Sequence, residues 1–411
     1  MSKIIFINRF FHPDFSATSQ MLSDLAFALA ADDNLDIHVV TSRLLYDDKT
    51  TRLSAEETLN GVRVHRVLTS SLGRVRTRHQ IFDYLTFFVT CSWKLFWLAK
   101  RGDTVVVKTD PPLMSVPTMV LTRLLRARQV NWQQDAFPEI AMAAEMRTNN
   151  RFVDGVFFGL LTRLRNESVL HTGQTVVLGE RMLEHMASQI ARPKRVRSKV
   201  SIIPNWTDTD AIVPVVPQQN PMRKQWELRD AFVVGYSGNM GIAHDFAVLL
   251  EAAQRLQSDE RIQLLFIGNG KRKRYVQHAV KTKQISNVQF KPYQPRSMLA
   301  KSLSVPDVHI VTLRPEMEGL IVPSKFYGVA AAGRPTIFLG DLDGEIARNI
   351  AAFDCGVAVE PDDVEGLVKA IQTYSDNPDL AARHGANARQ MAVEHFDLKV
   401  SVQKWKALLT D

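Results

Sequence analysis

Short apolar runs alternate with amphipathic helical segments along most of this chain, and that alternation constrains its fold more than any other feature. Residues 3–8 (KIIFIN) have the pattern of a buried strand, residues 18–31 have helical periodicity, and residues 35–41 (LDIHVVT) return as a strand. A repeated strand–helix–strand rhythm is typical of a doubly wound parallel sheet, whose ligands bind beyond the carboxyl ends of the strands.

The length of the chain predicts two domains of this kind. Its 411 residues exceed what one hydrophobic core commonly serves, and its 45% apolar and 23% charged content is that of a globular protein. The fold class we expect is therefore α/β, with two Rossmann-like doubly wound domains facing a central cleft. Residues 1–200 are expected to form the first domain and residues 201–390 the second, and a helix at 391–411 should cross back to the first.

Cysteine usage and the start of the chain indicate a compartment. The two cysteines, Cys91 and Cys355, lie far apart in the sequence, which favours a reducing environment and argues against a disulfide or a cysteine-based metal site. Residues 1–8 resemble a strand and lack the architecture of a signal peptide. We therefore expect a cytoplasmic protein.

The excess positive charge lies entirely in the first half of the chain. Residues 1–200 hold 27 Lys and Arg against 19 Asp and Glu, whereas residues 201–411 hold 24 of each kind. This asymmetry predicts an anionic partner, such as a membrane surface or a phospholipid-type acceptor. No nucleic acid partner is expected, because the sequence contains no recognition-helix, zinc or RNA-binding signature.

Residues 313–340 (LRPEMEGLIVPSKFYGVAAAGRPTIFLG) contain the most informative turn of the chain. Pro323-Ser324-Lys325 is expected to open a helix, since Pro fits the first helical turn and Ser can cap it, and Gly333 is expected to end that helix. Lys325 would then lie where free backbone N–H groups favour an anion. A strand, a turn that suits phosphate, a helix and a second strand make half of a nucleotide site.

Two more strand ends in the second half carry glycines. The strand expected at 232–237 runs into Gly238-Asn239-Met240-Gly241, with a helix from about His244, and Gly268 ends the strand expected at 264–268. Glycine-rich turns between a strand and a helix allow backbone amides to approach phosphate closely.

The sequence PSKFYGVAAAGRPTI resembles the signature P-S-K-x-x-E-x-x-A-x-G-x-P of family 4 glycosyltransferases with the GT-B fold. The resemblance extends over nearly the whole chain and is greatest to the bacterial exopolysaccharide and O-antigen branch, similar to the colanic-acid type of enzyme. It implies transfer of a sugar from a UDP- or GDP-sugar to an acceptor hydroxyl, with retention at the anomeric carbon. It also implies that closure of the cleft orders both substrates and that no cofactor is needed.

The resemblance implies a catalytic role for three residues. Lys325 would stabilise the departing diphosphate, and Asp135, in WQQDAFPE after a strand, would orient or deprotonate the acceptor hydroxyl. The family's two acidic positions fall on Leu320 and Gly328 here, so Glu318, slightly upstream, is expected to take part of the first role. An unperturbed Asp, with a pKa of about 3.9, is a poor base at neutral pH, so burial would have to raise its pKa. The alternative for Asp135 is a helix cap.

The resemblance also implies which turns contact the substrates. Many relatives have Arg and Lys where this chain has Asn239 and His244, so Lys325 is expected to be the main cation, with His244 substituting in part if protonated. Tyr293 is expected to stack on the base, with packing as the alternative. The expected donor-binding residues are Gly238, Asn239, Gly241, His244, Gly268, Tyr293, Gly319, Leu320 and Ser324. The expected acceptor-binding residues are Ser16, Thr18, Asp110 and Glu139, although Glu139 could instead pair with an arginine.

Residues 74–101 form the most aromatic segment of the chain. Its apolar part is too short and too interrupted to span a bilayer, which takes about 20 apolar residues, but it suits a helix lying in the headgroup region. The alternative is a helix packed on the sheet. The expected membrane contacts are Arg74, Arg76, Arg78, Phe88, Trp93 and Trp97. We therefore expect peripheral association with the inner face of the cytoplasmic membrane and a polyprenyl-diphosphate-linked saccharide as acceptor.

Other functions stay open at this point. The same fold serves nucleotide-sugar 2-epimerases, and a non-catalytic scaffold is suggested by Asn239, His244 and Gly328, which depart from the family pattern. A metal site is not expected. The two Asp-x-Asp spacings, Asp208/Asp210 and Asp341/Asp343, have no histidine or third carboxylate close by in the sequence.

Overall fold

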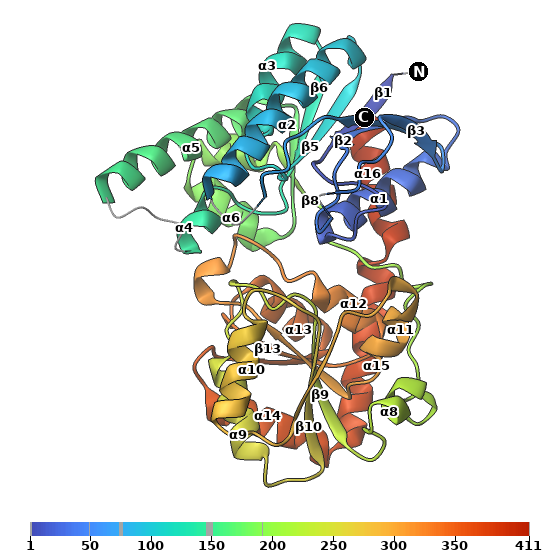
Figure 1. Ribbon diagram of the computed structural model, residues 1–411, viewed down its shortest axis with the longest axis vertical. Coiled ribbons are helices and arrows are strands. Elements are labelled where there is room, and N and C mark those ends of the chain that lie inside the picture. Colours follow the sequence, from blue (N-terminus) through green and yellow to red (C-terminus); the bar gives the residue numbers. More distant parts are fainter. Residues whose placement is uncertain (1, 49, 74–76, 145–150, 191, 411) are drawn as a thin grey trace. The chain divides into compact units, whose positions relative to one another are not determined.

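The computed structural model describes the chain except residues 1, 49, 74–76, 145–150, 191 and 411, and the side chains of residues 77, 78 and 151–153 (Figure 1). The chain divides into two compact units. Unit 1 comprises residues 1–204 together with residues 401–411, and unit 2 comprises residues 205–400.

In the described residues, the sheet of unit 1 has eight strands in the order β3-β4-β2-β1-β5-β6-β7-β8. All neighbours are parallel except β3 and β4, which form an antiparallel hairpin at one edge. Strand β5 is an apolar run buried along its whole length, as expected for a parallel sheet covered on both faces. The strands are β1 (Lys3–Ile7), β2 (Asp36–Ser42), β3 (Glu56–Leu59), β4 (Val62–Val67), β5 (Thr104–Lys108), β6 (Arg128–Trp132), β7 (Gln174–Val177) and β8 (Val200–Ile202).

Helices cover the sheet of unit 1. Helix α2 contacts α3, and α3 contacts α5. One side of α2 enters the core through Phe87, Cys91 and Leu95. The helices are α1 (Ala17–Ala30), α2 (Thr77–Leu98), α3 (Ser115–Leu125), α4 (Glu139–Ala143), α5 (Arg151–His171), α6 (Glu180–Ser188), α7 (Pro193–Arg197) and α16 (Leu398–Thr410). Trp405 of α16 packs against Trp132, with the ring centroids 4.6 Å apart and the rings tilted by 54°, which attaches the last residues of the chain to unit 1.

The described sheet of unit 2 is fully parallel, with six strands in the order β11-β10-β9-β12-β13-β14. Its core lies between this sheet and the apolar faces of α9 and α14. The strands are β9 (Phe232–Ser237), β10 (Ile262–Ile267), β11 (Val288–Lys291), β12 (Val308–Thr312), β13 (Thr336–Leu339) and β14 (Gly356–Val359).

The helices of unit 2 follow the strand–helix–strand rhythm of the sequence. They are α8 (Pro221–Gln225), α9 (Ala247–Leu256), α10 (Lys273–Thr282), α11 (Leu299–Leu303), α12 (Lys325–Ala331), α13 (Glu345–Phe353), α14 (Val364–Asp376) and α15 (Pro378–His395), with short 3₁₀ turns η1 (Pro217–Gln219), η2 (Arg296–Met298) and η3 (Pro315–Met317). The helix expected from His244 begins at Ala247 instead, because residues 241–246 form a turn and a short irregular segment before it. Gly333, with φ of +64°, follows the end of α12 as predicted.

The two sheets confirm the predicted fold class of two doubly wound α/β units. Strand order reverses between β1 and β5 in unit 1 and between β9 and β12 in unit 2. At such a reversal the connections leave in opposite directions, so the carboxyl ends of these strands are the places where a ligand can enter. Within the described residues, none of the helices has the length and apolar character needed to cross a bilayer.

Candidate active site

A buried lysine lies at the carboxyl ends of the strands of unit 1, the edge where ligands bind in sheets of this kind. Lys108 is the last residue of β5 and is only 2% exposed. Its ammonium donates a hydrogen bond to the carbonyl of Thr18 over 2.9 Å and lies 3.8 Å from the centroid of the Trp132 ring. Burial lowers the pKa of Lys108 to about 7, although the nearby carboxylates of Asp135 and Asp110 favour its charged form.

Asp135 follows β6 at the same edge of the sheet. Burial and, to a smaller extent, the neighbouring Asp110 raise its pKa to about 6, while Lys108 acts in the opposite direction. The carboxyl group is thus ionised at neutral pH, yet its pKa is close enough to 7 for efficient proton transfer. The alternative of a helix cap is not what the structure shows, since α4 has Pro138 at its N-cap position.

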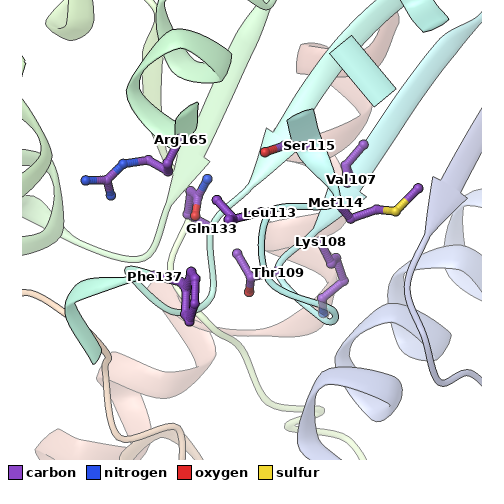
Figure 2. Close-up of a pocket in the computed structure, with 9 residues that line it drawn as sticks. All are labelled: Val107, Lys108, Thr109, Leu113, Met114, Ser115, Gln133, Phe137 and Arg165. Carbon is purple, nitrogen blue, oxygen red and sulfur yellow. The ribbon is translucent and has the colours of Figure 1, made fainter. Parts of the chain in front are cut away.

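A small cavity of about 10 Å³, with room for roughly one water molecule, lies beside these groups (Figure 2). Lys108 and Thr109 line it from the end of β5, Gln133 from the end of β6 and Arg165 from α5. Figure 2 shows the Lys108 and Thr109 side chains beside the turn that follows β5.

The Glu139 carboxylate contacts other side chains of the protein. Its Oε1 atom accepts a hydrogen bond of 2.5 Å from Arg165, and His185 lies 3.7 Å away. Burial alone would raise the pKa of Glu139, but His185 and Arg165 hold it below its usual value. Of the two roles expected for Glu139, the structure shows the arginine pair.

Three of the predicted unit 1 residues therefore meet around one lysine that the sequence reasoning did not select. Thr18 contacts Lys108 directly, and Asp110 and Asp135 interact with it electrostatically. Ser16 precedes α1, and its backbone N–H donates to Asp14 Oδ1. The sequence does contain a clue to Lys108, because this lysine ends the otherwise apolar run TVVVK. A cation in a buried strand needs polar or charged partners, which makes it a candidate site residue.

The turns after β9 and β10 lie in close contact within unit 2. Gly268 has φ of +137°, and a Cβ atom there would lie 2.1 Å from the carbonyl oxygen of Gly238. A Cβ atom on Gly270 would meet the carbonyl of Met240 at 2.5 Å. Only glycine fits these two positions, so the backbone itself forms the surface of the site.

The Lys325 ammonium lies beside this glycine turn. A Cβ atom on Gly238 would be 3.7 Å from Lys325 Nζ. Lys325 hydrogen-bonds the Tyr236 hydroxyl, which in turn donates to the Asn239 carbonyl over 2.9 Å. Burial lowers the pKa of Lys325 well below its ordinary value, and among the described residues no carboxylate pairs with it.

His244 does not supply the expected second cation. Its Nδ1 atom donates to the Thr312 carbonyl over 2.6 Å, and the residue is 8% exposed. Burial, followed by repulsion from Lys325, lowers its pKa to about 3, so the imidazole is neutral under physiological conditions. The predicted substitution by a protonated His244 is therefore wrong, and the ring instead packs edge-on against Tyr236 at 5.9 Å.

The acidic turn after β12 has a structural contact of its own. Glu318 Oε1 accepts a hydrogen bond from the backbone N–H of Glu345, which begins α13, so Glu318 lies at the N-terminus of that helix. Gly319, with φ of +73°, and the buried Leu320 complete the turn that leads to Lys325.

The remaining expected donor residues lie at the surface of unit 2. Ser324 occupies the N-cap position of α12, but its side chain makes no capping hydrogen bond, contrary to our expectation. Gly241 is next to Asn239, whose side chain is 3.1 Å from the place a Cβ would take. Tyr293, at 54% exposure, follows β11 and interacts electrostatically with Tyr236.

The residues expected to contact a membrane divide between the two sides of α2. Trp93 and Trp97 are each 66% exposed, whereas Phe88 is half-buried and packs against the core of unit 1. The expectation of a membrane-facing Phe88 is therefore wrong, because its position on the helix faces the sheet. Arg74 and Arg76 lie outside the described residues, as does the side chain of Arg78.

The part of the chain that the structure describes contains no group of three or more His, Cys, Asp or Glu side chains placed to hold a metal ion.

Comparison of the sequence with known proteins identifies relatives. Residues 218–391 match the family model described as glycosyl transferases group 1. The chain is 27% identical over 328 residues to a protein named as the probable glycosyltransferase WbjE of Pseudomonas aeruginosa, over 80% of this chain and 78% of the relative. It is 26% identical over 321 residues to the putative colanic acid biosynthesis glycosyl transferase WcaI of Escherichia coli K12, over 76% of this chain and 75% of the relative.

Solved structures share the fold over its full length. Sucrose-phosphate synthase from Thermosynechococcus elongatus has a TM-score of 0.77 at 15% identity, covering 100% of this chain and 98% of the other. HepE from Anabaena, solved in complex with UDP-glucose, has a TM-score of 0.72 at 14% identity and covers 100% of both chains.

Proposed function

Because the chain has the GT-B fold and belongs to the group 1 glycosyl transferases, we propose that it moves a sugar from a UDP- or GDP-sugar to a lipid-linked saccharide, with retention at the anomeric carbon. The product would be an intermediate of a bacterial cell-surface polysaccharide. The acceptor saccharide would be carried on a polyprenyl diphosphate at the inner face of the cytoplasmic membrane.

The Lys325 ammonium beside the glycine turn is the observation that carries this proposal. It has a hydroxyl partner in Tyr236 but, among the described residues, no carboxylate partner. A desolvated cation of this kind gains most from a ligand with multiple negative charges. Gly238 has no side chain, and a Cβ atom there would lie 3.7 Å from Lys325 Nζ, so the backbone of this turn lies next to the ammonium. The diphosphate of a nucleotide sugar fits both requirements.

Electrostatic stabilisation of the leaving group follows from this arrangement. As the bond between the anomeric carbon and the diphosphate oxygen breaks, negative charge builds up on the diphosphate and positive charge on the sugar ring. Lys325, held in place by Tyr236, stabilises the growing negative charge without rearrangement. His244, the other side chain expected to carry charge at this turn, is neutral, so Lys325 supplies the stabilisation.

Asp135 is the proposed acceptor-side group in unit 1. Its carboxylate orients the acceptor hydroxyl and takes the proton as the oxygen of that hydroxyl bonds to the anomeric carbon. A pKa near 6 keeps the carboxylate ionised at pH 7 and still basic enough for the transfer. Lys108 is a positioning residue in this proposal, because it acts on the substrate only through the electrostatics of Asp135 and Asp110.

Nucleotide binding tests the donor site directly. We would record thermal unfolding of the wild type, Lys325→Ala and the control Lys301→Ala with UDP, GDP and a panel of nucleotide sugars. Lys301 is an exposed lysine of the same unit. A ligand that binds only the folded state raises its melting temperature, so one nucleotide should stabilise the wild type and Lys301→Ala but not Lys325→Ala. Equal stabilisation of all three proteins would disprove the role of Lys325.

Product analysis then separates transfer from the other chemistries of this fold. The proposal predicts a glycosylated lipid-linked acceptor and free nucleoside diphosphate. Conversion of the nucleotide sugar to its 2-epimer in the absence of acceptor would show an epimerase instead. Nucleotide binding with no turnover of any donor by the full-length protein would indicate a scaffold.

A further inference from the structure

We propose that helices α2, α3 and α5 of unit 1 together form a docking face for an anionic lipid bilayer. This inference rests on the proposed lipid-linked acceptor and adds the surface by which the enzyme reaches it. We define the docking face by its exposed apolar residues. They are Ile81, Phe82, Leu85, Val89, Trp93, Phe96 and Trp97 of α2, Val120 and Leu124 of α3, and Val156, Phe157, Leu160 and Leu164 of α5.

The α2 part of the docking face is a continuous stripe. Ile81, Leu85, Val89, Trp93 and Trp97 recur every fourth residue, which places them above one another on one side of the helix. Their exposed fractions run from 49% to 69%. The opposite side of α2 is already used by the protein core, so α2 is apolar on two sides and only one of them is covered.

The other two helices repeat this arrangement. On α3, Val120 and Leu124 are four residues apart and are 60% and 67% exposed. On α5, Val156, Leu160 and Leu164 follow the same spacing, with exposed fractions of 61%, 55% and 36%. Isolated apolar residues are normal on protein surfaces, but stripes on three neighbouring helices are not.

The three stripes belong to one surface. Helix α3 contacts both α2 and α5, and all three are labelled close to one another in Figure 1. Each helix buries the side that faces the sheet of unit 1. The exposed stripes are therefore on the side away from the sheet, where no other described part of unit 1 covers them.

The charges around the docking face suit an anionic surface. Arg101, Arg123, Arg126 and Arg163 lie on or next to these helices and are exposed, and among the described residues none of them pairs with a carboxylate. The acidic residues are placed differently. Asp83 and Asp154 are 3% and 7% exposed, and Glu167, in the last turns of α5, pairs with His171.

An apolar face bordered by cations, with its carboxylates buried or paired, is the pattern of an interfacial membrane helix. Tryptophan is favoured at the level of the lipid headgroups, and Trp93 and Trp97 are the most exposed aromatic residues of α2. Since none of the described helices can span a bilayer, the helices would lie in the interface plane, with the apolar stripes inserted and the arginines at the phosphates.

Vesicle sedimentation tests this inference with the purified full-length protein. Vesicles of phosphatidylglycerol and phosphatidylcholine should bind the wild type, and vesicles of phosphatidylcholine alone should bind it at least tenfold more weakly. Binding should weaken as salt rises, because exposed charges are screened. Equal binding to both vesicle types, or no binding to either, would overturn the proposal.

Each helix is tested by its own variant. Trp93→Glu with Trp97→Glu tests α2, Leu124→Glu tests α3 and Leu160→Glu tests α5, with Val393→Glu as the control. Val393 is an exposed apolar residue, 42% exposed, on helix α15 of unit 2. All three test variants should lose binding at least tenfold with unchanged melting temperatures, and the control should bind normally. Full binding by both the Leu124 and Leu160 variants would restrict docking to α2 and refute the three-helix face.

Charge reversal provides the second arm. Loss of one cation at an anionic surface should weaken binding about fivefold. Arg123→Glu and Arg163→Glu should each weaken binding by more than fivefold, because the new carboxylate is also repelled by the anionic lipid. The matched control is Arg229→Glu, an exposed arginine of unit 2, which should bind as the wild type does. Unchanged binding in both test variants would contradict the electrostatic part of the proposal.

Two measurements separate this proposal from its alternatives. Sedimentation equilibrium without lipid should give a monomer, whereas a dimer abolished by Trp93→Glu with Trp97→Glu would show that a second copy covers the face. Lys325→Ala should bind vesicles like the wild type, since Lys325 belongs to unit 2. Vesicle binding by an inactive protein would leave the docking face intact even if the proposed transfer reaction failed.

Discussion

The Lys325 ammonium lies 3.7 Å from the centroid of the Tyr236 ring and also hydrogen-bonds the hydroxyl of that residue. The ring face attracts the cation and the hydroxyl fixes its direction. The strand order of unit 2 reverses between β9 and β12. Tyr236 belongs to β9, and Lys325 opens α12, the helix that follows β12, so the pair links the two sides of this reversal. We therefore expect Tyr236 to position the cation for the donor diphosphate.

Removal of the Tyr236 hydroxyl tests this role. Tyr236→Phe keeps the ring but removes one hydrogen bond to a charged group, worth about 1.5–3 kcal/mol. We expect kcat/KM for the donor to fall about 10- to 100-fold, with most of the loss in kcat. The control is Tyr275→Phe, a 49% exposed tyrosine of α10. Normal kinetics in Tyr236→Phe would show that the ring alone positions Lys325.

Diphosphate binding should be accompanied by proton uptake. Burial lowers the pKa of Lys325 in the free protein, and a bound diphosphate would favour the charged form and raise it again. Affinity for UDP or GDP should therefore decrease as pH rises. Calorimetric titrations at one pH in two buffers of different ionisation enthalpy measure the uptake, which should disappear in Lys325→Met. A donor affinity independent of pH between 6.5 and 9 would contradict this prediction.

The pH dependence of turnover should reflect the protonation of Asp135. A base with a pKa of about 6 is inactivated by protonation, so kcat/KM should fall as pH drops below about 6. Asp135→Asn should lose activity at least 100-fold and show no acidic limb of this kind. A pH–rate profile of both proteins measures the difference, and retention of the limb in the variant would exclude Asp135 as its origin.

The same substitution should stabilise the fold at neutral pH. The pKa of Asp135 is raised in the folded state, so ionisation costs stability above the ordinary carboxyl range near 4 and costs nothing below it. Asp135→Asn should therefore gain roughly 3 kcal/mol in free energy of unfolding at pH 7.5, and the gain should vanish as pH falls toward 4. Urea unfolding at several pH values measures it.

Lys108 should control the pH at which Asp135 titrates. Its charge lowers the pKa of Asp135, so replacement by an uncharged residue should raise that pKa. We expect Lys108→Met to shift the acidic limb of kcat/KM above pH 6 while donor affinity, a property of unit 2, stays unchanged. An acidic limb at the wild-type position would show that Lys108 only fills space beneath Trp132.

Close packing of the glycine turns makes a prediction about Gly268. A Cβ atom at this position would lie 2.1 Å from the Gly238 carbonyl oxygen, and φ of +137° is unfavourable for any other residue. Gly268→Ala should thus destabilise unit 2 and weaken UDP or GDP binding. The control is Gly102→Ala, where φ is also positive, at +89°, but nothing lies within 4 Å. Thermal unfolding is measured with and without nucleotide. A lower melting temperature with normal stabilisation by nucleotide would indicate backbone strain alone, whereas loss of that stabilisation would indicate that the turn itself is disrupted.

Local patterns predicted the elements best where one strand is uniformly apolar. Strand β9 has the bounds expected from the sequence, 232–237, because a strand buried on both faces leaves a nearly continuous apolar run. Strand β3, with the sequence EETL, was not predicted, since its side chains are exposed or half-buried and only pairing with β4 makes it a strand.

The sequence by itself determined the two parallel α/β sheets, the glycine turns and the position of Lys325 at the start of α12, because each depends on residues that are close together in the chain. Only the tertiary structure decided that Lys108 meets Thr18, which is 90 residues away, and that Tyr236 holds Lys325 across 89 residues. It also decided that His244 is uncharged. Charge state and contact depend on burial, and burial arises only when distant segments pack together.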